Sequence, residues 1–174
     1  MSTPEELKRY VRDVADFPQP GIIFRDITPL LGRKELFREV VNMMSKRWND
    51  APPDLVAAIE ARGFIPGAAI ADKLNAGLVP IRKKGKLPWK TISDAYHLEY
   101  GVNELEVHSD AVEPGQKVLI VDDVLATGGT AAAAVRLIRR LGGEVIGVQV
   151  LIELEALGGR KLLDGVEVIS EIVY

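Results

Sequence analysis

The apolar residues of the chain fall either in short continuous runs or in segments with helical signals, and these two patterns predict alternating strands and helices. Four short runs are continuously apolar and bounded by turn residues: 55–59, 78–81, 118–121 and 145–152. Between and before them, three segments carry helical signals: 34–48, 66–75 and 131–141. Because a continuously apolar strand is covered on both faces, the pattern predicts an α/β fold with a parallel sheet between helices.

Two parts of the chain depart from this alternation. Near the start, Thr3 and Glu6 form a capping box, which predicts a helix with Leu7, Tyr10, Val11 and Val14 on one face. A short β-like run follows at 22–27. Residues 83–109 break the pattern, and we expect 90–93 to pair with 105–107 as an antiparallel excursion. No linker or repeat is visible, so residues 1–174 are predicted to form one domain.

Composition narrows the chemistry. The 174 residues include no cysteine, which excludes thiol nucleophiles and cysteine zinc sites, and only two histidines, His97 and His108, to which we assign no role. With a net charge of −3, the chain lacks the excess of basic residues that is typical of proteins that bind duplex nucleic acid. The charged start lacks a signal-peptide pattern, and the apolar runs are too short to span a bilayer. We therefore expect a cytoplasmic protein without a membrane or nucleic-acid partner.

The sharpest motif follows the apolar run 118–121. Asp122 and Asp123 come first, and a loop with two glycines then opens into a helix: Ala126, Thr127, Gly128, Gly129 and Thr130. Backbone N–H groups at a helix start suit a phosphate, and the carboxylates suit hydroxyls or a hydrated metal. The lysine of a triphosphate loop and the G-x-G-x-x-G dinucleotide pattern are both absent. The motif therefore favours a ribose 5-phosphate, against the alternative of an acidic turn before an ordinary helix.

Segment 118–130 resembles the phosphoribosyl-diphosphate signature of the type I phosphoribosyltransferases. Four more segments are similar to the adenine phosphoribosyltransferases of that family: 20–29, 62–64, 81–88 and 98–101. The resemblance implies a central parallel sheet flanked by helices, a small N-terminal hood (about 1–33) and an antiparallel lid (about 83–109). It also implies purine salvage, in which phosphoribosyl diphosphate and adenine give AMP and diphosphate, in a homodimeric enzyme.

The resemblance assigns roles to particular residues. Glu99 becomes the acid/base towards adenine, and Asp122 and Asp123 hold the ribose hydroxyls. The other implied substrate-binding residues are Ile23, Phe24, Arg25, Arg62, Arg82, Lys83, Lys86, Tyr100, the 126–130 loop and Leu154. Magnesium (Mg2+) would be held mainly by substrate oxygens and water, with no direct protein ligand. A cis peptide bond is implied near Glu60–Ala61, where the family usually has Ser in place of Ala61.

Alternatives remain open at this point. The cationic cluster 82–86 could be a solvated loop or an RNA patch, Arg62 a helix-start residue, and Glu99 a surface carboxylate. Phe24 and Leu154 could be core residues. The enzyme could use hypoxanthine, guanine or xanthine instead of adenine. The chain could also be a non-catalytic regulator that senses phosphoribosyl diphosphate, although such a protein would normally carry a DNA-binding module or a strongly basic face.

Overall fold

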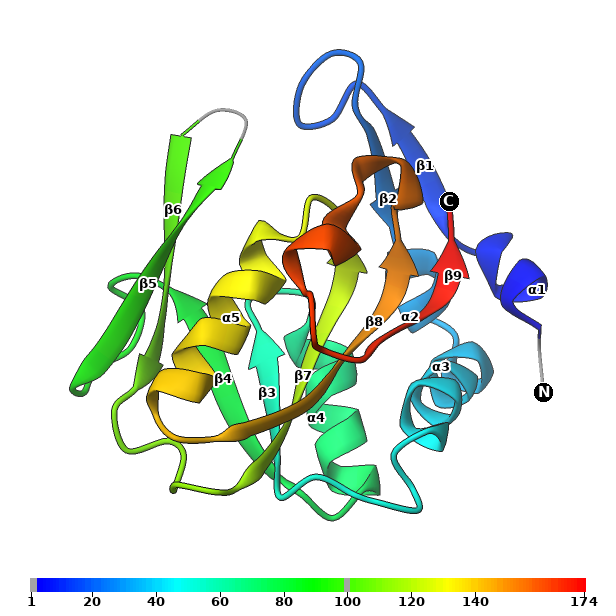
Figure 1. Ribbon diagram of the computed structural model, residues 1–174. Helices are drawn as coiled ribbons and strands as arrows, with labels where there is room; N and C mark the ends of the chain where they lie inside the picture. Colours follow the sequence, from blue (N-terminus) through cyan, green and yellow to red (C-terminus); the bar gives the residue numbers. More distant parts are fainter. Residues whose placement is uncertain (1–2, 99–100) are drawn as a thin grey trace.

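The computed structural model describes residues 3–98 and 101–174, and its centre is a mixed sheet (Figure 1). In these residues the sheet has seven strands in the order β5-β6-β4-β3-β7-β8-β9. Their bounds are β3 Leu55–Ile59, β4 Gly77–Lys83, β5 Thr91–Leu98, β6 Gly101–His108, β7 Lys117–Leu125, β8 Glu144–Glu153 and β9 Val168–Val173. The five neighbouring strands β4, β3, β7, β8 and β9 run parallel. Strand β6 pairs antiparallel with both β4 and β5. The predicted fold class is confirmed.

Helices cover both faces of the parallel strands. Helices α3 (Lys34–Lys46) and α4 (Phe64–Lys73) share one core cluster with Leu119 and Val121 of β7. Helix α5 (Gly129–Arg140) shares the other cluster with Val118 and Ile120. Since successive strand residues point to opposite faces, these four apolar residues feed two cores at once. This explains why the strand reads as a continuous apolar run.

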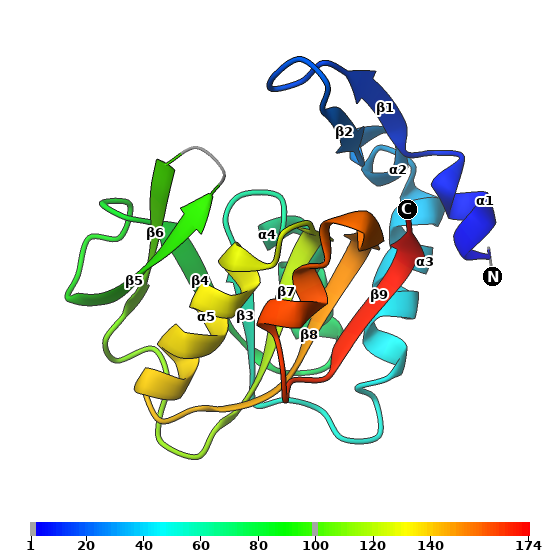
Figure 2. The ribbon, with the colours of Figure 1, turned by 45° about the horizontal axis from the view of Figure 1, so that its top comes forward.

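A second, two-stranded sheet lies at the edge of the main sheet where the parallel strands end (Figures 1 and 2). It joins β1 (Arg12–Ala15) to β2 (Ile23–Asp26), between the short helices α1 (Pro4–Lys8) and α2 (Thr28–Leu31). The capping box of α1 is confirmed, since Thr3 and Glu6 bond reciprocally. The prediction of one helical face through Val14 is wrong. Pairing with β2 overrides the helical period, which is a weak local preference.

The antiparallel excursion is confirmed and longer than predicted. Strands β5 and β6 pair from Thr91–His108 to Leu98–Gly101. Strand β9 and the two 3-10 turns before it, η1 (Glu155–Leu157) and η2 (Gly159–Leu162), were not predicted. Strand β7 continues to Leu125, so Asp122 and Asp123 lie within the strand and do not follow it. None of the helices in residues 3–98 and 101–174 has the length and apolar character needed to span a bilayer.

Candidate active site

Two adjacent carboxylates lie near the carboxyl end of the central strand β7. Asp123 is buried, and its Oδ2 atom lies 2.7 Å from Nε of Arg62 without the alignment of a hydrogen bond. Asp122 is partly buried, and its Oδ1 accepts a hydrogen bond of 2.8 Å from the Asp123 backbone N–H. A buried oxygen without a hydrogen-bond donor fits a ligand hydroxyl. Asp123 Oδ2 is thus compensated in charge by Arg62 and still has the capacity to accept a hydrogen bond.

Burial changes the titration of both carboxyl groups. It raises the pKa of Asp122 well above its usual range, and the neighbouring Asp123 carboxylate raises that pKa further. Burial also raises the pKa of Asp123, against an opposing effect from the Arg62 guanidinium. The two adjacent carboxyl groups thus resist holding two negative charges. A ligand whose hydroxyls donate hydrogen bonds to the carboxylates, or that brings positive charge, would lower the cost of burying these charges.

The turn after β3 lies directly against this pair. The Glu60–Ala61 peptide bond is cis, which confirms the expectation from the resemblance. The next glycine, Gly63, is so close to β7 that a Cβ atom there would lie 2.8 Å from Oδ1 of Asp122. Only glycine fits this position, and it brings Arg62 to Asp123.

Arg62 also contacts the N-terminal hairpin. Its Nη1 donates a 3.2 Å hydrogen bond to the Arg25 carbonyl, and its guanidinium lies 4.4 Å from the centre of the Phe24 ring. Phe24 is half-buried and meets Phe17 edge-on at 5.1 Å between ring centres. A single side chain therefore links the hairpin to the carboxylates of β7.

The other predicted base-site residues lie around the same edge. Ile23 is exposed on β2, and Arg25 is ion-paired with Asp13 and lies 3.9 Å from the centre of the Tyr174 ring. Leu154, directly after β8, is partly buried and donates its backbone N–H to Leu125 at the end of β7. The chain thus carries apolar groups to both sides of the β7 terminus.

The predicted phosphate loop joins β7 to α5. Gly128 has φ 85°, a left-handed conformation that favours glycine, and the described residues give α5 no side-chain cap. The N–H groups of the first turn thus remain available to an anion. A small cavity of about 130 Å³ lies here, lined by Val124, Leu125, Ala126, Thr127, Gly128, Thr130 and Ala131.

The basic loop (residues 82–86, the last two residues of β4 and the turn after them) is held by two glutamates that the sequence did not single out. Glu60 accepts a 3.0 Å hydrogen bond from Arg82 Nε and a 3.1 Å hydrogen bond from the Lys83 backbone N–H. Burial opposes the charge of Glu60, but these bonds outweigh it and lower the pKa. Arg82 also donates a 2.8 Å hydrogen bond to the Lys86 carbonyl. Arg82 is therefore engaged within the protein, while Lys83 and Lys86 are exposed.

The second of these residues is Glu106 on β6, which is 4% exposed. It accepts 2.8 Å hydrogen bonds from the backbone N–H groups of Lys86 and Leu87, and 3.3 Å from the Thr91 hydroxyl. Burial opposes its charge, but the backbone donors outweigh it and lower the pKa. No local pattern marks Glu106, because its partners lie 15 to 20 residues earlier, in the basic loop and the segment after it.

Some predicted residues are not placed. Glu99 and Tyr100 lie outside the described residues. His108 closes β6, and its Nε2 is buried without a hydrogen-bond partner. In the described ranges, no group of three His, Asp or Glu side chains could hold a metal ion. The Asp122–Asp123 pair fits at most a hydrated cation whose ligands come mainly from substrate.

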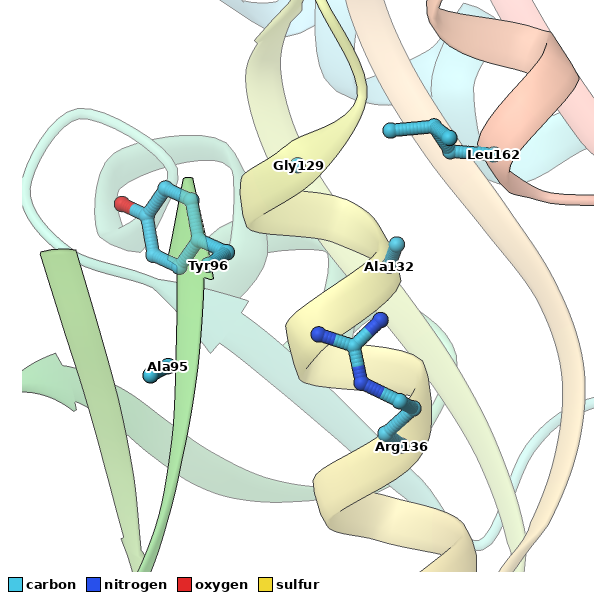
Figure 3. A pocket seen from close by; sticks show the side chains of 6 residues that line it. All are labelled: Ala95, Tyr96, Gly129, Ala132, Arg136 and Leu162. Carbon is cyan, nitrogen blue, oxygen red and sulfur yellow. The ribbon is translucent and has the colours of Figure 1, made fainter. Parts of the chain in front are cut away.

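A separate cavity of about 260 Å³ lies between β5 and α5 (Figure 3). Its lining is Ala95, Tyr96, Gly129, Ala132, Arg136 and Leu162. Arg136 at this cavity is paired with Asp94 at 2.8 Å. The cavity adjoins the helical side of the phosphate loop, and its lining includes none of the carboxylates, so we do not take it as the reaction site.

Comparison with known proteins agrees with this geometry. The family model described as a phosphoribosyl transferase domain matches residues 29–172. An adenine phosphoribosyltransferase of Thermotoga maritima is 58% identical over 97% of this chain and 98% of its own.

Solved structures agree as well. A crystal structure of adenine phosphoribosyltransferase from Thermoanaerobacter pseudethanolicus matches with a TM-score of 0.96 and 50% identity, over 99% of this chain and 100% of that one. The Saccharomyces cerevisiae enzyme, complexed with an imino-altritol bisphosphate and adenine, matches with a TM-score of 0.91 and 34% identity over 97% and 98%. The chain belongs to the phosphoribosyltransferase family, and within it to the adenine phosphoribosyltransferases.

Proposed function

We propose that this protein transfers the phosphoribosyl group of 5-phosphoribosyl 1-diphosphate to adenine, giving AMP and diphosphate. The observation that carries the proposal is the meeting of three features at one sheet edge. These are the Asp122–Asp123 pair, the glycine loop before α5, and the Phe24 hairpin that Arg62 links to Asp123. Relatives named for this activity cover nearly the whole chain.

We assign the phosphate and ribose roles to β7 and its loop. The backbone of residues 126–130, with the hydroxyls of Thr127 and Thr130, would bind the 5-phosphate at the start of α5. The carboxylates of Asp122 and Asp123 would accept hydrogen bonds from the ribose hydroxyls. Two carboxylates beside the ring would also offset positive charge that develops on the ribosyl group as diphosphate leaves. Anchoring phosphate and ribose together would orient the anomeric carbon.

The adenine site would lie under the N-terminal hairpin. Phe24 offers a ring for stacking, with Leu154 as the opposite wall and the backbones of Ile23 and Arg25 as edge readers. Since Arg62 covers one face of Phe24, adenine would use another surface or displace the guanidinium. Glu99 would accept or return the imidazole proton as the glycosidic nitrogen bonds to the anomeric carbon. This last role, like that of Tyr100 in substrate binding, rests on the resemblance.

The diphosphate would leave toward four cationic side chains. Arg62 lies in the turn after β3, and Arg82, Lys83 and Lys86 lie at the end of β4 and in the turn after it. Lys83 and Lys86 are exposed and ready to bind, while Arg82 would have to exchange Glu60 for diphosphate. Magnesium bound to the diphosphate oxygens would neutralise their charge in the transition state. Asp122 and Asp123 would contact it at most through water.

We also propose the organisation of the chain in these terms. Residues 1–174 form one phosphoribosyltransferase domain, with about 1–33 as the hood and about 83–109 as a lid that closes over the reacting atoms. A closed lid would keep water from the ribosyl cation. We further propose a cytoplasmic homodimer, on the strength of the resemblance and the absence of cysteine. Light scattering after size exclusion measures the oligomeric state directly.

The function is tested by incubating the protein with magnesium, phosphoribosyl diphosphate and one base at a time. We expect AMP from adenine and little product from hypoxanthine, guanine or xanthine, with chelator and Asp123→Asn as negative controls. Preference for another base would replace adenine as the substrate. No nucleotide from any base, together with tight binding of phosphoribosyl diphosphate, would favour the regulator alternative.

A further inference from the structure

The segment after β8 packs against the side of the phosphate loop. Gly159 is buried, and a Cβ atom on it would lie 2.9 Å from the Gly128 nitrogen and still closer to the Ala126 carbonyl oxygen. Conversely, a Cβ atom on Gly128 would lie 2.9 Å from the carbonyl carbon of Gly159. The two backbones therefore touch, and the position of Gly159 limits where the loop can lie.

The residue after Gly159 fixes this segment to the sheet. Arg160 forms two 2.7 Å hydrogen bonds with Glu153, from Nε to Oε1 and from Nη2 to Oε2. It also donates a 3.0 Å hydrogen bond to the Ser170 hydroxyl and a 2.7 Å hydrogen bond to the Val168 carbonyl. The Ser170 hydroxyl in turn donates 2.6 Å to Glu153 Oε2. Arg160 is thus fastened to the end of β8 and to β9 at once.

This cluster differs from an ordinary surface ion pair. The Glu153 side chain is 6% exposed, and hydrogen bonds from Arg160 hold its pKa below the usual range. A bidentate arginine fixes geometry as well as charge. A buried carboxylate that lost this partner would be left uncompensated. We therefore expect Arg160 to be held in one conformation.

The neighbouring base-site residue is held by other contacts. Leu154 donates its backbone N–H to Leu125, and Glu153 and Glu155 exchange backbone hydrogen bonds with Tyr174. These bonds do not involve the Arg160 side chain. Loosening Arg160 should therefore move Gly159 more than it moves Leu154.

We propose that Arg160 is a positioning residue: through Glu153 and Gly159 it holds the 126–130 loop in the shape that binds the 5-phosphate. The proposal rests on the proposed function, because it takes the 5-phosphate to bind in this loop. Arg160 itself would contact no substrate. Its effect passes through backbone packing, which transmits small shifts because protein interiors are densely packed.

Calorimetric titration with ribose 5-phosphate tests the proposal without turnover. Arg160→Ala should weaken this binding about tenfold or more, since small misplacements of a binding group are costly. Arg160→Lys keeps the charge but not the fork, so it should bind with intermediate affinity. Arg47→Ala is the matched control, because Arg47 makes a similar forked pair with Glu167 beside Lys117 and Glu144, at the start of β7 and β8.

A glycine pair tests the contact itself. Gly159→Ala should weaken ribose 5-phosphate binding at least as much as Arg160→Ala, because its Cβ enters the loop backbone. Gly32→Ala should not, since a Cβ atom there meets only Thr28 at 3.4 Å and the backbone is helical. If Arg160→Ala does not fold, Arg160→Lys and Gly159→Ala decide the question.

Steady-state kinetics separate positioning from general damage. We expect Arg160→Ala to raise KM for phosphoribosyl diphosphate while KM for adenine stays within about twofold, whereas a merely loosened fold would change both. If Arg160→Ala and Gly159→Ala bind ribose 5-phosphate with wild-type affinity, the inference about Arg160 is wrong, and the proposed function is unaffected. If the wild-type protein itself does not bind ribose 5-phosphate, the phosphate-loop assignment fails, and the inference fails with it.

Discussion

Arg62 and Asp123 meet with Nε 2.7 Å from Oδ2, although they lie about 60 residues apart in the chain and on separate elements. The same guanidinium contacts the Phe24 ring and the Arg25 carbonyl. A cation at this position lowers the cost of a buried carboxylate and connects the base hairpin to the ribose site. Substrate binding at either end must therefore rearrange or use the same side chain.

Asp123→Asn tests the carboxylate pair. We expect kcat to fall about 100-fold or more, because the negative charge beside the reacting ring is lost. The free energy of unfolding should change by only about 1 kcal/mol or less, since the isosteric amide still fills the site. Urea denaturation and turnover are measured on the same preparation. Wild-type turnover in this variant would remove the carboxylate argument.

Asp122→Asn should stabilise the protein at neutral pH when no substrate is added. The raised pKa of Asp122 means that folding favours its protonated form, so its charge lowers stability as pH rises above the unfolded pKa. The amide lacks this cost, so the variant should melt at a higher temperature than the wild type at neutral pH. Thermal melts should show a difference from wild type that grows between about pH 4 and neutrality. A difference that shrinks over that range contradicts the prediction.

Phe24→Ala tests the base platform. KM for adenine should rise about tenfold, because stacking contributes roughly 1–3 kcal/mol per base. KM for phosphoribosyl diphosphate should change much less. Phe17→Ala is the graded comparison, since Phe17 supports the Phe24 ring in a T-shaped contact, and its effect should be smaller. Equal effects on both substrates would show that the hairpin position, and not stacking, is at stake.

Lys83→Ala and Lys86→Ala test the diphosphate clamp. Each should raise KM for phosphoribosyl diphosphate or lower kcat by about tenfold, an effect that added salt would mimic in the wild-type protein. Lys84→Ala is the matched control, because Lys84 is already paired with Glu104 at 2.7 Å. If all three variants behave alike, the loop acts as a diffuse charge and not as a clamp.

Glu106→Gln tests the internal support of the basic loop. Its lowered pKa means that the carboxylate stabilises the fold above its unfolded pKa, and that this stabilisation is lost as pH falls through the folded pKa. The variant should therefore be less stable than wild type at neutrality, and the gap should close on acidification below about pH 4. Glu104→Gln, on the same strand with a solvent-exposed partner, should change stability little.

The sequence by itself determined the alternation of strands and helices, because apolar runs report how each strand is covered. It also determined the motif of residues 122–130, whose carboxylates and glycines are contiguous in the chain. It misjudged Val14, whose helical spacing was overridden by pairing between β1 and β2. It missed the bonds of Glu60 and Glu106 to the basic loop, where partners about 20 residues apart leave no periodic trace.

Only the tertiary structure decided how the separate motifs join. The close approach of Gly63 to Asp122 brings Arg62 to Asp123, and the hairpin then brings Phe24 to the same guanidinium. The packing of Gly159 on Gly128, secured by Arg160, is likewise a contact between distant segments. Local sequence encodes period and chemistry, but such contacts depend on the parallel order of the strands, which places their carboxyl ends at one edge.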